Sequence, residues 1–109
     1  MNVFSVHFAS DAVDDLRDIR KWLTQERGAA FAESFVAALF SYCEGLSLIP
    51  HRGTVRDDLY LGLRLIGWRR RALVAFLVDD AVQTVTVVAV SLRGRDMAAM
   101  LSSRTGEKP

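Results

Sequence analysis

The sequence lacks the features of a disulfide-bonded, secreted or membrane-spanning protein. Cys43 is its only cysteine, so no disulfide can form within the chain, and a reducing compartment suits it. No apolar run reaches the roughly 18–20 residues that span a bilayer. The N-terminus has no basic segment ahead of an apolar one, as a signal peptide requires. We therefore expect a cytoplasmic protein without a membrane segment.

Residues that carry catalysis or bind metals are also scarce. His7 and His51 are the only histidines, and neither lies in a spacing typical of a zinc site. Cys43 falls on an apolar stripe of an expected helix, which favours a core position over a nucleophile. Asp57-Asp58 and Asp79-Asp80 are better explained as turn residues than as an acid–base pair. The sequence therefore predicts no catalytic, metal or cofactor site.

The net charge of +1 conceals an asymmetry between the two halves of the chain. Residues 1–51 carry four basic and seven acidic side chains, whereas residues 52–109 carry ten basic and six acidic ones. An arginine-rich second half predicts a surface that meets a negatively charged partner. The alternative is that the arginines only keep an apolar sheet in solution. The modest excess of basic over acidic side chains in residues 52–109 is compatible with that role.

Hydrophobic patterning predicts a single α+β domain with the order strand, two helices and three strands. The expected elements are a strand over residues 2–8, a helix from an N-cap at Ser10 to Arg27, a helix from about Ala29 to Pro50, and strands over Tyr60–Trp68, Leu73–Val78 and Val82–Val90. Gly28 joins the two helices into an antiparallel hairpin. The three later strands form an antiparallel meander, and the helical hairpin packs on one face of a mostly antiparallel sheet.

The sequence also makes predictions for the start of the first helix, the last strand and the C-terminal residues. The helix dipole favours the negative charges in the first turns of the first helix, namely Asp11, Asp14 and Asp15. The last strand is apolar on both alternating sets, which predicts a central strand covered on both faces. Residues 96–101 predict short helical turns, and the polar residues 102–109 predict a flexible tail outside the domain of residues 1–101.

Arginines gather around the last two strands. Arg69-Arg70-Arg71 precedes this hairpin and Arg93-Gly94-Arg95 follows it, so antiparallel pairing places the two clusters side by side. Arg64 lies between Leu63 and Leu65 in a strand, which places it on the opposite face from both. There it either pairs with a carboxylate of the chain or recognises an external group, and the sequence favours neither.

An ordered set of short motifs resembles the RelE/ParE family of bacterial type II toxin–antitoxin toxins, specifically the ParE branch. The resemblance runs from about Phe4 to Met100. Its motifs are Asp15-Leu16-x-x-Ile19, Ala32-x-x-Phe35, Pro50-x-x-Gly53, Arg56-x-Asp58-Leu59, Gly62-Leu63-Arg64 and Arg95-Asp96. Their order and spacing are more specific than any one of them. The chain departs from the family where Phe76 replaces a common tyrosine, and where Leu92-Arg93-Gly94-Arg95-Asp96 replaces a His-Gly-Arg-Arg-Asp run.

The resemblance implies a toxin that a cognate acidic antitoxin, similar to ParD, neutralises in a hetero-oligomer. It also implies a target, because ParE toxins inhibit DNA gyrase, whereas RelE toxins cleave mRNA with basic residues and a tyrosine or histidine near the C-terminus. Between Tyr60 and Lys108 this sequence has no Tyr, His or Lys, which favours gyrase inhibition without catalysis. A RelE-like ribosome-dependent endoribonuclease and a non-toxic antitoxin-binding member are the alternatives. The expected residues for binding antitoxin or target are Arg64, Arg71, Arg93 and Arg95.

Overall fold

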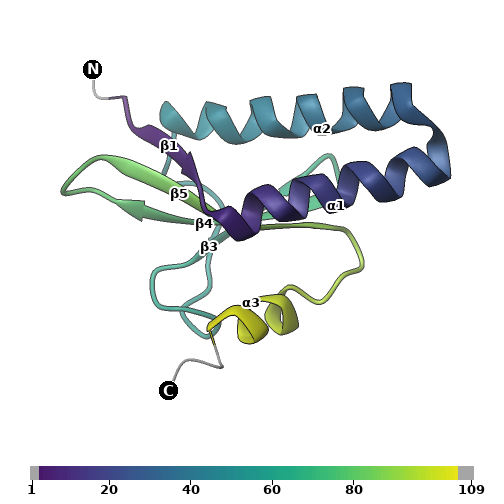
Figure 1. Ribbon diagram of the computed structural model, residues 1–109. Helices are drawn as coiled ribbons and strands as arrows, with labels where there is room; N and C mark the ends of the chain where they lie inside the picture. The colour runs from purple at the N-terminus through teal and green to yellow at the C-terminus, as the bar shows by residue number, and fades with distance from the viewer. Residues whose placement is uncertain (1–2, 106–109) are drawn as a thin grey trace.

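A five-stranded sheet forms the centre of the fold, with two long helices on one face and a short helix on the other (Figure 1). The computed structural model describes residues 3–105, except for the side chain of Thr105. Its elements are β1 (Ser5–Phe8), α1 (Ser10–Arg27), α2 (Ala29–Glu44), the 3-10 turn η1 (Gly45–Ser47), β2 (Thr54–Val55), β3 (Arg64–Trp68), β4 (Ala72–Asp79), β5 (Thr84–Leu92) and α3 (Met97–Thr105). The predicted α+β class is confirmed, with β2 as an unexpected short strand.

The strands are arranged in the order β1-β5-β4-β3-β2. Strands β4 and β5 form the predicted antiparallel hairpin, and β3 continues the meander. Strand β1 pairs in parallel with β5, with Ser5 opposite Thr84 and Phe8 opposite Val87. Within the described residues, β5 therefore has a strand partner on this side only as far as Val87.

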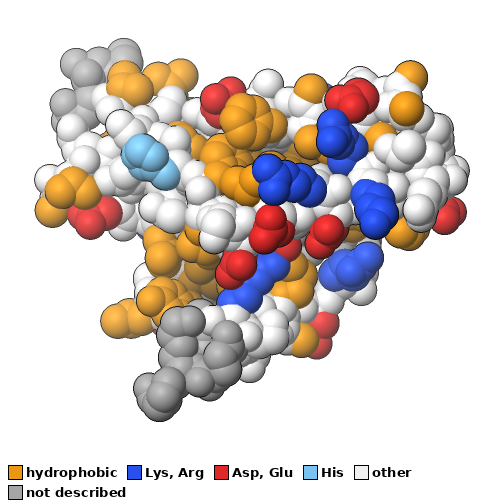
Figure 2. Space-filling view, in the orientation of Figure 1, with side chains coloured by type: hydrophobic (Ala, Val, Ile, Leu, Met, Phe, Trp, Pro, Cys, Tyr) orange, Lys and Arg blue, Asp and Glu red, His pale blue; other side chains and the backbone are white. Residues whose placement is uncertain are grey.

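Each face of the sheet carries its own hydrophobic core. The larger core lies beneath the helical hairpin and includes the buried side chains of Leu16, Leu39, Val74, Phe76 and Val87. The smaller core lies beneath α3 and includes Leu63, Ala75, Ala89, Met97 and Leu101. Strand β5 contributes to both, as its two apolar sets predicted. Hydrophobic side chains remain visible between the sheet and α3 (Figure 2).

Helices α1 and α2 form the predicted antiparallel hairpin around Gly28. Its φ of 93° lies outside the range that side-chain-bearing residues favour, and its N–H donates to Thr24 O at 3.0 Å, which closes α1. The prediction that Ser10 is the N-cap is wrong. Ala9 occupies that position without a side-chain cap, because its N–H still pairs with Val87 O at 2.9 Å and the helix begins directly afterwards.

Three of the predicted strands begin later than expected. The strand predicted from residue 2 begins at Ser5, and turns precede the other two. Residues 60–63 form a turn, in which Leu63 N–H donates to Tyr60 O at 2.9 Å, so the strand predicted from Tyr60 begins at Arg64. Val82 is 69% exposed in the turn ahead of β5, because the Asp79 side chain accepts hydrogen bonds from the backbone there. Both turns are held by polar contacts that an apolar pattern does not reveal.

The last two helices also differ from prediction at their C-terminal ends. Helix α2 ends at Glu44, and the chain reaches Pro50 through η1 and a loop. Helix α3 continues to Thr105, so the flexible tail predicted from residue 102 is wrong for residues 102–105. Residues 106–109 lie outside the described residues. None of the helices in residues 3–105 is long and apolar enough to cross a membrane.

Candidate functional site

An arginine-lined cleft lies where the β3–β4 turn, the end of β5 and the joint between α1 and α2 come together. The helix joint and the segment after β5 lie on the same side of the molecule (Figure 1). The cleft has a volume of about 610 Å³. We call it the arginine cleft; its lining residues are Trp22, Leu23, Glu26, Arg27, Phe31, Phe35, Arg69, Arg70, Arg71, Leu92 and Arg93.

The β3–β4 turn presents arginines in an unusual backbone conformation. Arg71 N–H donates to Trp68 O at 2.8 Å, which closes a β-turn. Its central residues, Arg69 and Arg70, have φ values of 51° and 55°. Two consecutive positive φ values are typical of type I′ turns, where Asn-Gly is preferred. A side-chain-bearing residue in this region costs about 1–2 kcal/mol, so the turn exposes two arginines at the expense of stability.

Aromatic rings hold two of the guanidinium groups in place. Arg69 Cζ lies 4.6 Å from the centre of the Trp68 ring, and Arg27 Cζ lies 4.1 Å from that of Phe31. The Trp68 ring is buried and packs edge-on against Phe35 at 5.2 Å. Such cation–π contacts orient the guanidinium groups without neutralising their charge.

Backbone hydrogen bonds fix the two arginine clusters side by side, as the hairpin pattern predicted. Arg93 N–H donates to Arg71 O at 2.7 Å, and Arg93 Nη1 donates to Arg70 O at 3.4 Å. None of the five arginines of the cleft forms a salt bridge with a carboxylate in the described part of the chain. The arginine cleft is therefore a site of concentrated positive charge, with Glu26 as its one acidic lining residue.

The four arginines proposed from the sequence do not share one site. Arg71 and Arg93 line the arginine cleft. Arg64 lies at the other end of β3, where Arg64 Nη1 donates to Arg52 O at 3.2 Å. It occupies the face opposite Leu65, as predicted, yet this face carries the larger core. Arg95 lines a small neighbouring pocket between α1 and β5.

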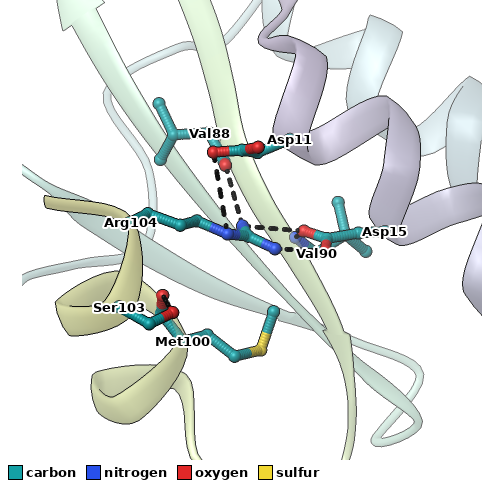
Figure 3. A network of polar contacts seen from close by, with 7 residues as sticks. All are labelled: Asp11, Asp15, Val88, Val90, Met100, Ser103 and Arg104. Carbon is teal, nitrogen blue, oxygen red and sulfur yellow. Dashed lines mark hydrogen bonds and ion pairs between the residues drawn. The ribbon is translucent and has the colours of Figure 1, made fainter.

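A second polar cluster, which the sequence did not reveal, fastens α3 to α1 (Figure 3). The guanidinium of Arg104 binds both carboxylate oxygens of Asp15, with Nη1 at 3.0 Å from Oδ2, and approaches Asp11 at 3.8 Å. Asp15 also accepts the Val90 N–H at 2.9 Å. The hydrogen bond with Asp15 raises the pKa of Arg104 above its ordinary value. We call Asp15 and Arg104 the α3 clasp.

The remaining candidate groups have structural surroundings. His51 Nε2 lies 2.7 Å from Asp80 Oδ1, and this pair connects the loop after η1 to the β4–β5 turn. Cys43 is fully buried in the larger core, and burial together with the charge of Glu44 raises the pKa of its thiol to about 12. Among residues 3–105 no group of His, Cys, Asp or Glu is arranged to hold a metal ion.

A family comparison identifies the chain. The sequence model described as ParE toxin of type II toxin-antitoxin system, parDE, matches residues 6–97. The chain belongs to the ParE toxin family. No curated protein sequence matches this ParE-family chain.

Solved structures of related folds agree with the family. A chain from the chromosomal ParDE toxin–antitoxin system of P. aeruginosa is similar with a TM-score of 0.71 and 18% identity, covering 83% of this chain and 96% of that one. A chain of the RelBE2 toxin–antitoxin complex from Mycobacterium tuberculosis is similar with a TM-score of 0.62 and 20% identity, covering 84% and 99%. At these identities the likeness shows the fold alone.

Proposed function

We propose that this ParE-family toxin acts in the cytoplasm by binding DNA gyrase and inhibiting it without chemistry of its own. The observation that carries the proposal is the composition of the arginine cleft. Its five guanidinium groups suit a negatively charged target, whereas none of its lining residues is a Tyr, His or Lys. RNA cleavage needs a group that takes up or donates a proton beside the scissile phosphate, but inhibition by binding does not.

The proposal is tested by adding the purified chain to gyrase and relaxed plasmid DNA. We expect loss of supercoiling and accumulation of cleaved DNA, and a much weaker effect with Arg71→Ala combined with Arg93→Ala. Arg17→Ala is the matched control, because Arg17 is an exposed arginine of α1 that does not line the cleft. Full gyrase activity at a large excess of folded toxin would contradict the proposal.

Glu26 supports a second candidate function, a RelE-like ribosome-dependent endoribonuclease. Its carboxylate lines the arginine cleft and offers a general base other than Tyr, His or Lys. In that case Glu26→Gln abolishes codon-specific mRNA cuts soon after induction, as primer extension shows. Under the gyrase proposal mRNA stays intact on induction, and DNA damage responses and filamentation appear instead.

We further propose a cognate acidic antitoxin, similar to ParD, that neutralises the toxin in a hetero-oligomer. The similarity to chains from ParDE and RelBE systems supports such a partner. Acidic side chains of the antitoxin are expected to meet Arg64, Arg71, Arg93 and Arg95. Its apolar side chains are expected in the groove between α1 and α2, which has a volume of about 290 Å³ and is lined in part by Val13, Leu16, Val36 and Phe40.

Antitoxin affinity tests the partner surface. Removing one arginine from a buried charge pair is expected to weaken the complex by about 2–5 kcal/mol, whereas a rim arginine has little effect. Arg64→Ala is the most informative change, because Arg64 is half-buried. Lys21→Ala serves as the comparison, because Lys21 is exposed on α1 and lines neither the arginine cleft nor the groove between α1 and α2. Equal, near-zero losses would place the antitoxin elsewhere, and binding without growth arrest would identify a non-toxic family member.

A further inference from the structure

The arginine cleft has a half-exposed tryptophan beside its unneutralised charges. Trp22 projects from α1 and is 45% exposed, although large aromatic side chains are usually covered in a folded protein. It lines the same cleft as Arg27, Arg69 and Arg71. A flat apolar ring next to several guanidinium groups is the combination with which proteins bind single-stranded nucleic acid, because bases stack on the ring and phosphates meet the cations.

The arrangement of the arginines suits an extended chain of phosphates. Arg27 comes from the end of α1, Arg69 and Arg70 from the β3–β4 turn, and Arg93 from the end of β5, so the charges surround the cleft from three elements. The stacking of Arg27 on Phe31 and of Arg69 on Trp68 leaves the guanidinium N–H groups at their edges available as donors. One carboxylate would use only one or two of these guanidinium groups, whereas successive phosphates of a nucleic acid strand would use several.

The cleft is of a size that an unpaired base can enter but a base pair inside a duplex cannot. Its volume of about 610 Å³ falls within the range of pockets that hold drug-sized ligands. A base from a single strand can enter such a hollow and reach Trp22, whereas the paired bases of a duplex stay stacked inside the helix.

We propose that the arginine cleft binds single-stranded DNA, with a base stacked on Trp22 and the adjoining phosphates held by the arginines. The inference rests on the proposed function, because gyrase would be the source of the single-stranded DNA that meets the bound toxin. An acidic antitoxin segment in the same cleft would then exclude the DNA by charge mimicry. The binding itself requires neither gyrase nor antitoxin, so it is measurable on the toxin alone.

The test is fluorescence anisotropy with a labelled oligodeoxythymidine at several salt concentrations. Contacts to three or four phosphates predict a slope of about −2 to −3 for the logarithm of the binding constant against that of salt. Arg71→Ala and Arg93→Ala are each expected to reduce this slope by about 0.7, while Arg17→Ala leaves it unchanged. Trp22→Ala is expected to weaken binding at least about fivefold with the slope retained, and Trp22→Phe to restore most of it.

Duplex DNA and oligouridine are the comparison probes. Tighter binding of single-stranded DNA than of either one supports the proposal. Absence of salt-dependent binding, equal losses in Arg17→Ala and Arg71→Ala, or a preference for RNA or duplex DNA would overturn it. Gyrase inhibition by a chain that binds no DNA would refute this inference alone, and DNA binding without gyrase inhibition would refute the proposed function alone. Circular dichroism of each variant confirms that the comparison is between folded proteins.

Discussion

Asp15 and Arg104 together occupy the place of a missing strand along the second half of β5. Asp15 accepts the N–H of Val90, and Arg104 Nη1 donates to the C=O of Val88 at 3.3 Å (Figure 3). These backbone groups lie beyond Val87, where β1 ends as a pairing partner. Unpaired backbone groups on a sheet edge invite pairing with another chain, and the α3 clasp satisfies two of them with side chains.

The α3 clasp predicts a large stability difference between neighbouring aspartates. Asp15→Ala is expected to lower the free energy of unfolding by about 2–4 kcal/mol, because it leaves Arg104 and the Val90 N–H without their carboxylate. Asp14→Ala is the control, since Asp14 is exposed and forms only a loose pair with Arg17 at 3.7 Å. Its effect is expected within about 0.5 kcal/mol. Urea unfolding of both variants provides the measurement; equal values would show that the clasp does not stabilise the fold.

The β3–β4 turn predicts a trade between stability and binding. Replacing Arg69 with Asn and Arg70 with Gly supplies the residues that positive φ favours, so a gain of about 1–2 kcal/mol is expected. Toxin activity is expected to fall, because two cations leave the arginine cleft. Thermal unfolding and gyrase inhibition are measured on the same protein. Arg71 does not have a positive φ, so Arg71→Ala should weaken activity without raising the free energy of unfolding. A double variant less stable than the wild type would contradict the interpretation that the positive φ values of Arg69 and Arg70 cost stability.

Two glycines predict opposite responses to alanine. A Cβ at Gly53 would lie 2.3 Å from Leu65 O, where the chain has a φ of 77° and enters β2. Gly53→Ala is therefore expected to lower the free energy of unfolding by more than about 1 kcal/mol. Gly45 has a φ of −65° and open space at its Cβ position, so Gly45→Ala is expected to be neutral or to stabilise by up to about 1 kcal/mol. Chemical denaturation distinguishes the two.

The buried thiol predicts sensitivity to alkaline pH. Burial raises the pKa of Cys43 to about 12 from an ordinary value of 9.0, so the folded protein holds this proton more tightly than the unfolded chain does. The stabilisation is complete below pH 9 and is lost as the pH rises towards 12. The free energy of unfolding should thus fall more steeply with pH in the wild type than in Cys43→Ala over this range. Parallel pH profiles would mean that the thiol does not contribute, and rapid labelling of native Cys43 at pH 8 would contradict its burial.

Apolar patterning was sufficient to predict the fold because the buried positions of β4, β5 and the helical hairpin repeat with the period of their own element. The role of Asp15 was missed for the opposite reason. The helix dipole already explained an aspartate in the first turns of α1, and its partner Arg104 lay in a segment whose polar sequence indicated a tail. One signal was available. Asp15 lies three residues after Ala12 and four before Ile19, on the buried face of the helix.

The sequence predicted only part of the arginine cleft. Their gathering at the β4–β5 hairpin followed from strand direction, and the structure places Arg71 beside Arg93. The contributions of Trp22, Glu26 and Arg27 came from a helix far earlier in the sequence. Their presence in the cleft depends on how the helical hairpin lies over the sheet. The apolar repeats of 3.6 residues in a helix and two in a strand show which face is buried, but they do not specify this tertiary arrangement. Arg95 was grouped with the others because it follows the same strand, and Arg64 because the sequence predicted it mid-strand on the face opposite Leu63 and Leu65.

The parallel pairing of β1 with β5 constrains how this toxin is made in the cell. The first strand leaves the ribosome early, but its only sheet neighbour among the described residues begins at Thr84. The arginine cleft needs Arg93 from the end of that neighbour, and the α3 clasp needs Arg104. Sheet completion must therefore wait until nearly all of the polypeptide has been translated, because contacts so distant in sequence form late. A nascent chain stalled before β5 would lack Arg93 and Arg104, so it could complete neither the arginine cleft nor the α3 clasp.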